Sequence, residues 1–454
     1  MRYLLPKPLL SLANACPVPL YIVGGFTRDF LAGISPANGN FDLDICAPLP
    51  AETFVSIAKQ CAFTPLSIFK HTGTVKLKDE LGNDYEYSCF RSDKYVRGVH
   101  TPVEIHFTND ISLDARRRDF TANAVYYDIQ KDDFIDPLNG ITAIKEKRLS
   151  TVAPADKVFG EDGLRLMRLC RQSATLGFAP DSDCLYGATL HAPLIDDISP
   201  ERVFTELLAI LSADKKYGVK DGHYKGVKLL EEIGVLARIF PELALGKGMS
   251  QRADFHKYDV LEHSLRAVKY AREDVRLASL LHDIGKPFCF LRDGNSFSHP
   301  IEGERIVKET LSRLKAPKRL IEETATLTRL HMYDFNCQTT ENKLRRLLVE
   351  NFAIIDKLLA VKQADYSACM DDTSLAPTCA RWESLLNKMQ QERTPMTLKE
   401  LAINGNDLLA LDIPSRRIAT TLRALLRHTA TNPQDNEKSR LCKLAISFQR
   451  SIRE

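Results

Sequence analysis

The chemistry of this chain is most clearly indicated by a pair of aspartates and a pair of glycines upstream. Asp42 and Asp44 lie in an apolar-flanked stretch, and Gly24 and Gly25 follow a short apolar run. In a β-strand, side chains i and i+2 leave the same face, so the two carboxylates would point into one site. Two carboxylates at so short a distance repel each other unless a cation lies between them. Glycines before a helix let backbone N–H groups approach a phosphate. The pattern predicts a site for a metal-bound triphosphate.

Metal-assisted phosphoryl transfer also needs phosphate donors and a positioned hydroxyl nucleophile. Arg28 follows the glycine pair and is a candidate donor to the triphosphate. Glu86, in the alternating run 84–87, is a candidate third carboxylate that would hold a second metal or orient the nucleophile. The alternative reading of Glu86 is an ordinary strand carboxylate facing water, and the sequence leaves both open.

A second motif combines basic and amide side chains. Three consecutive arginines at 116–118 precede Asp119 and Asn123. They would supply fixed donors for phosphate oxygens and partners for ribose hydroxyls. A basic surface turn is the alternative, but Phe120 and Ala124 indicate that the segment packs against a core.

Five of the eleven histidines fall between residues 256 and 331. These are His256, His263, His282, His299 and His331. Neutral imidazole with carboxylate is ligand chemistry for a divalent metal that keeps positions open for water and phosphate. A lone buried histidine is usually a satisfied core residue, but adjacent His282 and Asp283 in an apolar segment are costly to bury without a metal.

The distribution of element signals divides the chain in two. Up to about residue 150, β-rich runs at 21–23, 41–45, 85–90, 103–107 and 124–129 alternate with helical pieces. From about residue 155 the apolar periodicity is almost wholly helical. We therefore expect an α+β fold: a mixed sheet with helices, followed by an all-α body.

Length, charge and cysteine content narrow the class of protein to which this chain can belong. The chain has 454 residues, 44% of them hydrophobic, and a net charge of +3. It is long enough for two to four domains, and it has no strongly basic tail. Its eleven cysteines form no Cys-x-x-Cys pair, which indicates reduced thiols. With no apolar stretch of membrane-spanning length, we expect a cytoplasmic protein that binds no membrane.

The head motifs resemble those of class II tRNA nucleotidyltransferases (CCA-adding enzymes) and the related bacterial poly(A) polymerases. Residues 24–29 match the family's Gly-Gly-x-x-Arg-Asp signature, with Thr27 where valine is commoner. Asp42 and Asp44 match its Mg²⁺ pair, and 117–124 match its ribose-contacting signature. The family's flexible loop would fall at 93–102. The resemblance implies a nucleotide site made by Gly24, Gly25, Arg28, Arg117, Arg118, Asp119 and Asn123.

The resemblance continues into the helical part. Residues 161–171 are similar to the neck helix that reads the incoming base, with Asp162 and Arg165 as i and i+3 neighbours on one helix face. Arg168 and Arg171 complete the predicted nucleotide-binding set, and Gln172 stands where the family usually has an aromatic residue. Residues 198–202 resemble the next family motif, which we assign mainly to structure, with Ser199 as a helix N-cap.

The histidine section resembles HD-type phosphohydrolase domains. The implied metal ligands are His263, His282, Asp283 and Asp365, with His299 and His331 at accessory positions for a second metal or the phosphate. Some tRNA nucleotidyltransferases carry such a domain with phosphatase or cyclic-phosphodiesterase activity. The last eighty residues resemble the family tail, in which Arg416 and Arg417 would contact the tRNA backbone. A solvated basic helix face is the alternative for these arginines.

The sequence thus predicts an enzyme, a tRNA nucleotidyltransferase that adds C and A to the tRNA 3′ end from CTP and ATP with Mg²⁺. A poly(A) polymerase, a CC- or A-adding enzyme, and an HD-type phosphohydrolase with a non-catalytic RNA-binding head are the alternatives. We expect a monomer that binds tRNA by backbone shape and does not bind DNA. The predicted domains are a nucleotidyltransferase head (1–150), a neck and RNA-binding body (151–250), an HD domain (251–370) and a helical tail (371–454).

Overall fold

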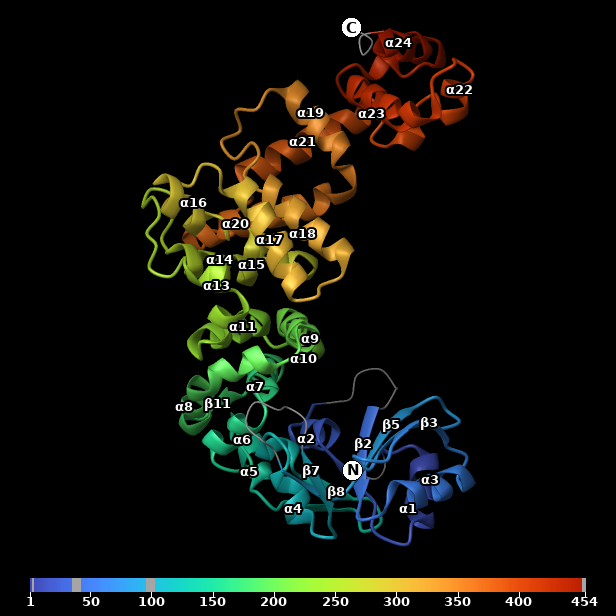
Figure 1. Cartoon of the computed structure of the whole chain (residues 1–454), viewed down its shortest axis with the longest axis vertical. Coiled ribbons are helices and arrows are strands. Elements are labelled where there is room, and N and C mark those ends of the chain that lie inside the picture. Colours follow the sequence, from blue (N-terminus) through green and yellow to red (C-terminus); the bar gives the residue numbers. More distant parts are fainter. Residues whose placement is uncertain (2–3, 35–41, 95–102, 451–454) are drawn as a thin grey trace. The chain divides into compact units, whose positions relative to one another are not determined.

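The computed structural model describes residues 1, 4–34, 42–94 and 103–450. The chain divides into two compact units, Met1–Pro241 and Glu242–Glu454. The first unit contains the sheet and its helices, and the second is built from helices (Figure 1). The predicted α+β class is confirmed. The finer divisions at residues 150 and 370 stay predictions.

The first unit is centred on a seven-stranded mixed sheet with the strand order β3-β4-β5-β2-β1-β8-β9. Strands β2 and β5 pair in parallel, and the other named pairs of this sheet are antiparallel. The strands are β1 (Tyr21–Val23), β2 (Asp42–Ala47), β3 (Thr64–Phe69), β4 (Thr74–Lys78), β5 (Asp84–Cys89), β8 (Tyr126–Asp128) and β9 (Asp133–Ile135), with smaller pairs β6 (Arg91–Lys94) with β7 (Glu104–Phe107) and β10 (Arg148–Leu149) with β11 (Ala179–Pro180).

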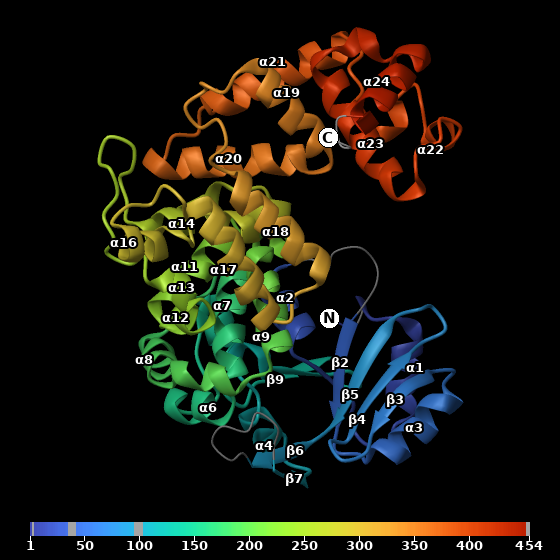
Figure 2. The same cartoon turned by 45° about the horizontal axis from the view of Figure 1, so that its top comes forward.

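Apolar side chains fix which face of the sheet is covered. In β5, Tyr85 and Tyr87 are buried while Asp84 and Glu86 are exposed, which is the alternation of a half-buried strand. The ring of Tyr87 stacks on Phe54 with centroids 3.6 Å apart. Helices α1 (Lys7–Ala15) and α3 (Ala51–Gln60) lie on this apolar side, which Figure 2 shows. The polar face of β2 and β5 is therefore left open.

Helices follow the sheet in the same unit. The long helix α7 ends at Gly177, whose φ of +69° suits the left-handed conformation of a helix C-terminus. It packs against α9, α10 and α11. The helices of this unit are α1, α2 (Gly25–Leu31), α3, α4 (Ile111–Arg116), α5 (Gly140–Lys145), α6 (Ala155–Glu161), α7 (Leu164–Leu176), α8 (Ser182–His191), α9 (Pro200–Leu211), α10 (Ala213–Tyr217), α11 (Gly222–Glu232) and α12 (Val235–Ile239).

The second unit has its own apolar core, with Trp382 fully buried among leucines and isoleucines. Its helices are α14 (Val260–Tyr270), α15 (Arg276–Leu281), α16 (Lys286–Asp293), α17 (His299–Arg313), α18 (Lys318–Leu330), α19 (Glu341–Glu350), α20 (Ile355–Met370), α21 (Pro377–Gln391), α22 (Gly405–Leu409), α23 (Ser415–Thr431) and α24 (Lys438–Arg450), after the short α13 (Pro241–Ala244) at the junction. No helix in the described ranges has the length and hydropathy needed to cross a bilayer.

Candidate functional site

The predicted carboxylates lie on the open face of the sheet. Asp44 pairs in parallel register with Glu86, and Asp42 pairs with Asp84 on the same two strands. Asp44 and Glu86 are both exposed. The side chain of Asp42 is outside the described part of the chain. Lys76 of β4 lies 3.7 Å from Glu86, so this carboxylate has a cationic neighbour on its own face.

Gly24 is required beside Asp44 for two reasons. Its φ is +83°, a region that side-chain-bearing residues rarely adopt. A Cβ placed on it would lie 2.8 Å from the Asp44 carboxylate oxygen Oδ2. Strand β1 ends at Val23, which pairs with Asp44. The glycine therefore lets the start of α2 approach the carboxylate as closely as the backbone allows.

A cavity of about 710 Å³ opens beside these residues within the first unit. Of the predicted nucleotide-binding and catalytic residues whose side chains the structure describes, all but Glu86 line it. The lining residues used below are Gly24, Gly25, Arg28, Asp29, Asp44, Arg117, Arg118, Asp119, Asn123, Asp162, Arg165, Arg168, Arg171, Gln172, Arg202, Lys216 and Tyr217.

Asp119 is the centre of a buried polar network in this cavity. Its Oδ2 accepts from Nε of Arg168 (2.8 Å) and Nε2 of Gln172 (3.3 Å), while its Oδ1 accepts from Nδ2 of Asn123 (2.9 Å). Burial would raise the pKa of Asp119, but Arg168 and these hydrogen bonds hold it well below its usual range. The carboxylate is therefore ionised, and it fixes three side chains at once.

Arg28 extends the network to the glycine helix. Its Nη1 donates to Oδ1 of Asn123 (2.6 Å), and its Nε and Nη2 donate to Oδ1 of Asp29 (2.9 and 2.7 Å). The Tyr217 hydroxyl of α10 donates to the other oxygen of Asp29. Arg28, predicted as a phosphate donor, is thus buried and joins α2 to the Asn123 segment. Its described contacts assign it a positioning role.

The paired arginines are balanced by one carboxylate that the sequence did not single out. Asp114 is fully buried and lies 2.6 Å from Nε of Arg117 and 3.1 Å from Nη2 of Arg118. The Tyr126 hydroxyl also donates to it (2.7 Å). Burial raises the pKa of Asp114, but the two guanidinium groups and the hydroxyl lower it to about 2. Asp114 therefore orders the arginines, and its place three and four residues before them was the available signal.

The prediction that Asp162 and Arg165 share one helix face is wrong. Asp162 is extended (φ −149°, ψ 108°) and separates α6, which ends at Glu161, from α7, which begins at Leu164. A Cβ at Gly163 would lie 2.5 Å from the Leu194 carbonyl oxygen. Both side chains still line the cavity. Asp162 accepts from the Leu164 N–H (2.9 Å), as an N-terminal cap of α7.

Arg165 is buried and contacts the head directly. Its Nη1 donates to the Val158 carbonyl and to Glu161 (2.9 Å each), and its Nη2 donates to the Arg117 carbonyl (3.0 Å). In these contacts it joins the neck to the arginine motif. Arg171 pairs with Glu206 of α9 (2.6 Å). Which of these arginines read a base stays a prediction.

Several lining residues were missed. Gln172 replaces the aromatic residue usual in the family, and the structure shows why an amide is accommodated: it bonds to both Asn123 and Asp119. Arg202 belongs to the motif that we assigned mainly to structure, yet its side chain lines the cavity. At the same motif Ser199 is the N-cap position but makes no side-chain cap hydrogen bond. Lys216 and Tyr217 carried no sequence signal, because only folding brings α10 to the head.

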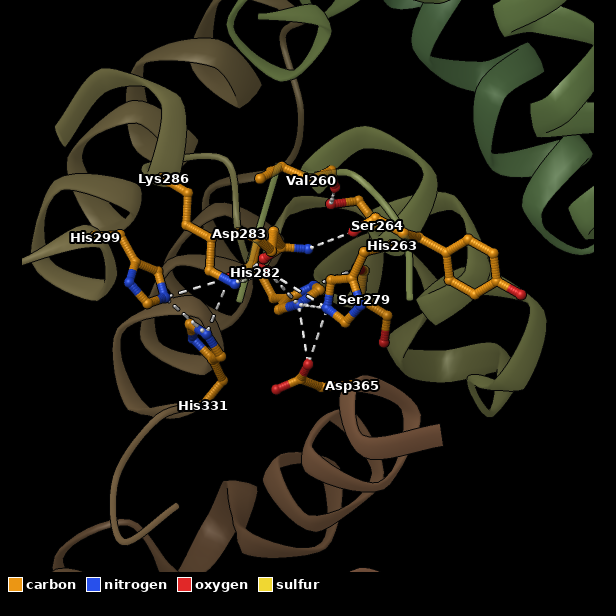
Figure 3. Close-up of polar contacts among 12 residues, drawn as sticks. Val260, His263, Ser264, Ser279, His282, Asp283, Lys286, His299, His331 and Asp365 are labelled. Atoms are coloured by element: carbon orange, nitrogen blue, oxygen red, sulfur yellow. Dashed lines mark hydrogen bonds and ion pairs between the residues drawn. The ribbon is translucent and has the colours of Figure 1, made fainter. Parts of the chain in front are cut away.

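The predicted HD residues converge in the second unit (Figure 3). Nε2 of His263 lies 3.0 Å from Asp365 and 3.4 Å from Oδ2 of Asp283, and Nε2 of His282 lies 3.2 Å from the same Asp283 oxygen. The other oxygen of Asp283, Oδ1, lies 3.2 Å from Nε2 of His299 and 3.5 Å from Nε2 of His331. Asp283 thus faces two groups of histidines with its two oxygens.

The histidine tautomers are fixed by the backbone. Nδ1 of His282, His299 and His331 lies 2.6–2.7 Å from the carbonyl of the residue three positions earlier. A ring nitrogen facing a carbonyl carries the proton, so Nε2 of each neutral ring presents a lone pair to the centre. The Nε2 atoms of His263 and His282 lie 3.1 Å apart, and those of His299 and His331 lie 3.2 Å apart. Two lone pairs cannot face each other at this distance without a cation or a proton between them.

Lys286 supplies a positive charge at the same centre. Its Nζ lies 2.6 Å from Oδ2 of Asp283 and 2.8 Å from the Gln251 side-chain oxygen. Burial lowers the pKa of His282, but Asp283 and Asp365 raise it to about 10. The carboxylates therefore attract positive charge strongly, as a metal site must.

The predicted RNA-contacting arginines lie on α23. Arg416 is exposed and Arg417 is half-buried, and Arg423 and Arg427 are exposed further along the helix. Arg427 pairs with Glu350 at 2.7 Å. Upstream, Asn404 and Asp407 form a capping box at the start of α22. RNA binding by this helix stays a prediction, as does a role for the loop 93–102, most of which lies outside the described residues.

Three family models match the chain in order. They are the poly A polymerase head domain at residues 20–150, the probable RNA and SrmB-binding site of polymerase A at 177–245, and the HD domain at 259–368. The predicted resemblance to nucleotidyltransferases that carry an HD domain is confirmed by these matches. The predicted enzyme class, nucleotidyltransferase, is thereby confirmed.

Relatives align along most of the chain or along its head. The A-adding tRNA nucleotidyltransferase of Deinococcus radiodurans is 27% identical over 430 residues, covering 89% of this chain and 90% of that one. The Multifunctional CCA protein of Neisseria gonorrhoeae is 27% identical over 427 residues (88% and 96%). The CCA-adding enzyme of Streptococcus mutans is 36% identical over 207 residues (45% and 49%).

Solved structures of CCA-adding enzymes have the same fold. The CCA-adding enzyme of Bacillus stearothermophilus in complex with CTP superposes with a TM-score of 0.67 at 23% identity, covering 99% of both chains. The Thermotoga maritima CCA-adding enzyme complexed with tRNA gives a TM-score of 0.60 at 19% identity, covering 97% of this chain and 94% of that one.

Proposed function

We propose that this chain is a tRNA nucleotidyltransferase that adds C and A residues to the tRNA 3′ end from CTP and ATP without a template. One observation carries the proposal: a single cavity gathers the glycine pair, Asp44, the arginine motif and the arginines of α7. Most full-length and head relatives are named CCA-adding or CCA proteins.

The charge of the cavity suits a triphosphate. Eight basic side chains line it against four acidic ones. Two of the acidic side chains, Asp29 and Asp119, are used to hold arginines in place. A polyanion would therefore enter a site whose donors are already oriented, which lowers the entropy cost of binding.

The carboxylates beside the cavity fit a divalent cation. The approach of Gly24 to Asp44 leaves a cradle that a Cβ would fill, and Glu86 lies in register on the same face. Mg²⁺ would be held by Asp44 and Asp42, with Glu86 as third carboxylate, and when bound it would polarise the α-phosphate and activate the 3′-hydroxyl. The chain itself would orient these carboxylate oxygens towards the triphosphate and hold the triphosphate in one orientation.

Base choice would come from the α7 side of the cavity. Asp162 can accept from an exocyclic amino group, and an arginine can donate to ring acceptors. The described contacts of Arg165 tie it to the head, and Arg168 is part-exposed while held by Asp119. We propose that Asp162 and Arg168 contact the base while Arg165 keeps the neck in place.

Incorporation assays test the proposal. Purified full chain would be given tRNA lacking its last three nucleotides, with CTP alone, ATP alone, or both. We expect C from CTP alone and complete ends with both. Addition of A only to tRNA already ending in CC would instead support the A-adding activity named for the Deinococcus relative. Long A-tails on unrelated RNA would identify a poly(A) polymerase.

A second activity is favoured by the geometry in the second unit. Atoms bound to one metal ion at about 2.0–2.2 Å lie roughly 3.0–3.6 Å from one another. The separations among His263, His282, Asp283 and Asp365 are 3.0–3.5 Å. We propose that these residues hold a divalent metal, with a second position made by Asp283, His299 and His331.

Such a site would hydrolyse phosphate esters. The bound metal would supply an activated water and a Lewis acid for the phosphoryl oxygens. Lys286 would add a cation beside the phosphate, and the backbone carbonyls at 279, 296 and 328 keep the ligand rings oriented. The test is metal content together with hydrolysis of a 2′,3′-cyclic nucleotide. A chain that hydrolyses the ester but extends no tRNA would establish the phosphohydrolase alternative.

A further inference from the structure

His263 is the exception among the histidines of the HD centre. The three other ligand histidines donate Nδ1–H to a backbone carbonyl. Nδ1 of His263 is fully buried and has no hydrogen-bond partner within the described structure. A buried nitrogen left unpaired costs about 1–3 kcal/mol. Because metal-ligand histidines almost always use their second nitrogen, something is expected to bind this one.

Two further ligand-type side chains stand beside it. The His256 ring lies edge-on to the His263 ring with centroids 4.9 Å apart, and its Nδ1 is also buried without a partner in the described chain. Cys369, one helical turn after Asp365 on α20, is a free thiol. The Lys257 N–H donates to the Cys369 carbonyl (2.9 Å), which holds the His256 segment against this end of α20.

We propose that His256, His263 and Cys369 form an additional metal position for a borderline-soft divalent ion such as Zn²⁺, next to the HD centre. One ligand atom from each residue lies within 4.8 Å of the others. Nε2 of His263 already faces Asp365 and His282, which leaves Nδ1 for the new position. A neutral imidazole offers one lone pair, so with both sites filled His263 would bridge the two ions as an imidazolate, and its ring N–H proton would be released to solvent.

The chemistry of the ligands selects the ion. A thiolate with two imidazoles favours Zn²⁺, Co²⁺ or Ni²⁺ over the hard ions Mg²⁺ and Ca²⁺. Separations up to 4.8 Å exceed those of a filled site, and the half-buried His256 and Cys369 can rotate inwards to close it.

Cobalt spectroscopy on the full chain tests the proposal without relying on either proposed activity. Metal-stripped protein titrated with Co²⁺ should develop a near-ultraviolet thiolate-to-cobalt charge-transfer band, and Cys369→Ser should abolish it and lower the bound metal by one ion per chain. Cys379→Ser, which alters another buried thiol of the same unit, should keep the band.

Two more variants separate the new position from the HD centre and from misfolding. His331→Ala removes a ligand of the HD centre only and should keep the charge-transfer band. His256→Gln should lower the cobalt affinity measured from this band at least tenfold. Thermal melting of each variant reports folding, and His256→Gln decides the matter if Cys369→Ser does not fold. A wild-type chain without the band, or a band that survives Cys369→Ser or is lost in His331→Ala, would overturn the proposal.

Discussion

The cavity of the first unit and the HD centre of the second unit achieve opposite electrostatic results with similar residue types. In the cavity, arginines outnumber carboxylates, and each buried carboxylate is committed to holding arginines. At the HD centre, two carboxylates and lone-pair nitrogens converge with Lys286 as the nearby cation. The first arrangement favours binding of an anion, and the second favours binding of a cation. The comparison teaches that each site's ligand can be inferred from which sign of charge is in excess.

The largest expected effect separates the two sites at the sheet. Asp44→Asn should reduce nucleotide incorporation into truncated tRNA by about a thousandfold or more, since it removes a metal-holding carboxylate. Hydrolysis at the HD centre should not change. Asp133→Asn, an exposed carboxylate on edge strand β9, is the matched control and should retain full incorporation. Normal incorporation by the Asp44 variant would show that this cavity is not the site of nucleotide transfer.

The reciprocal change lies on α20. Asp365→Asn should weaken divalent-metal binding at the HD centre about a hundredfold and reduce ester hydrolysis accordingly, while tRNA extension stays within twofold. Asp356→Asn, on the same helix but at the surface in a pair with Arg272, provides the control. Isothermal titration with Mn²⁺ measures the affinity. Equal losses in both activities would show that the sites are not independent.

A smaller effect is expected within the cavity. Gln172→Leu leaves Asn123 and Asp119 with unmet hydrogen bonds, which costs about 1–3 kcal/mol and should lower kcat/KM for nucleotide addition roughly tenfold. Ser173→Ala, which loses one hydrogen bond to the Phe178 carbonyl on the outer side of the same helix, should have no effect on addition. Steady-state kinetics with CTP and ATP distinguish the two. Unaltered kinetics in Gln172→Leu would mean that the network only supports folding.

The smallest effect concerns acid stability of the head. The pKa of Asp114 is lowered to about 2 in the folded chain, against about 3.9 in an unfolded one. Its stabilising contribution is therefore complete above about pH 4 and is lost as the pH falls towards 2. Asp114→Asn should melt at a lower temperature at pH 7, with the difference shrinking in acid. A difference that stays constant from pH 7 to pH 3 would contradict this assignment.

The sequence predicted the central strands because their alternation is clear. Strands β1, β2, β5, β7 and β8 lie within a few residues of the predicted runs. The hairpin of β3 and β4 was missed, since β3 is an edge strand with no buried residue, and its apolar Leu66, Ile68 and Phe69 are exposed.

The site was predictable where short motifs carried it, and not where folding joins distant segments. Motif spacing placed Gly24, Asp44 and Asn123 in one site, and the cavity includes all three. Nothing in the spacing shows that Arg28 donates to Asn123, 95 residues away, or that Tyr217 reaches Asp29. The Asp162–Arg165 error arose because helical periodicity was assumed through Asp162, whose backbone is extended between α6 and α7.

Sequencing of tRNA 3′ ends tests the central claim most directly. The full chain would be incubated with CTP, ATP and tRNA lacking its last three nucleotides, beside the Asp44→Asn and Asp365→Asn variants. The account predicts ends completed to CCA by the wild type and by Asp365→Asn, with no addition by Asp44→Asn. Completed ends from Asp44→Asn, or their loss only in Asp365→Asn, would contradict it.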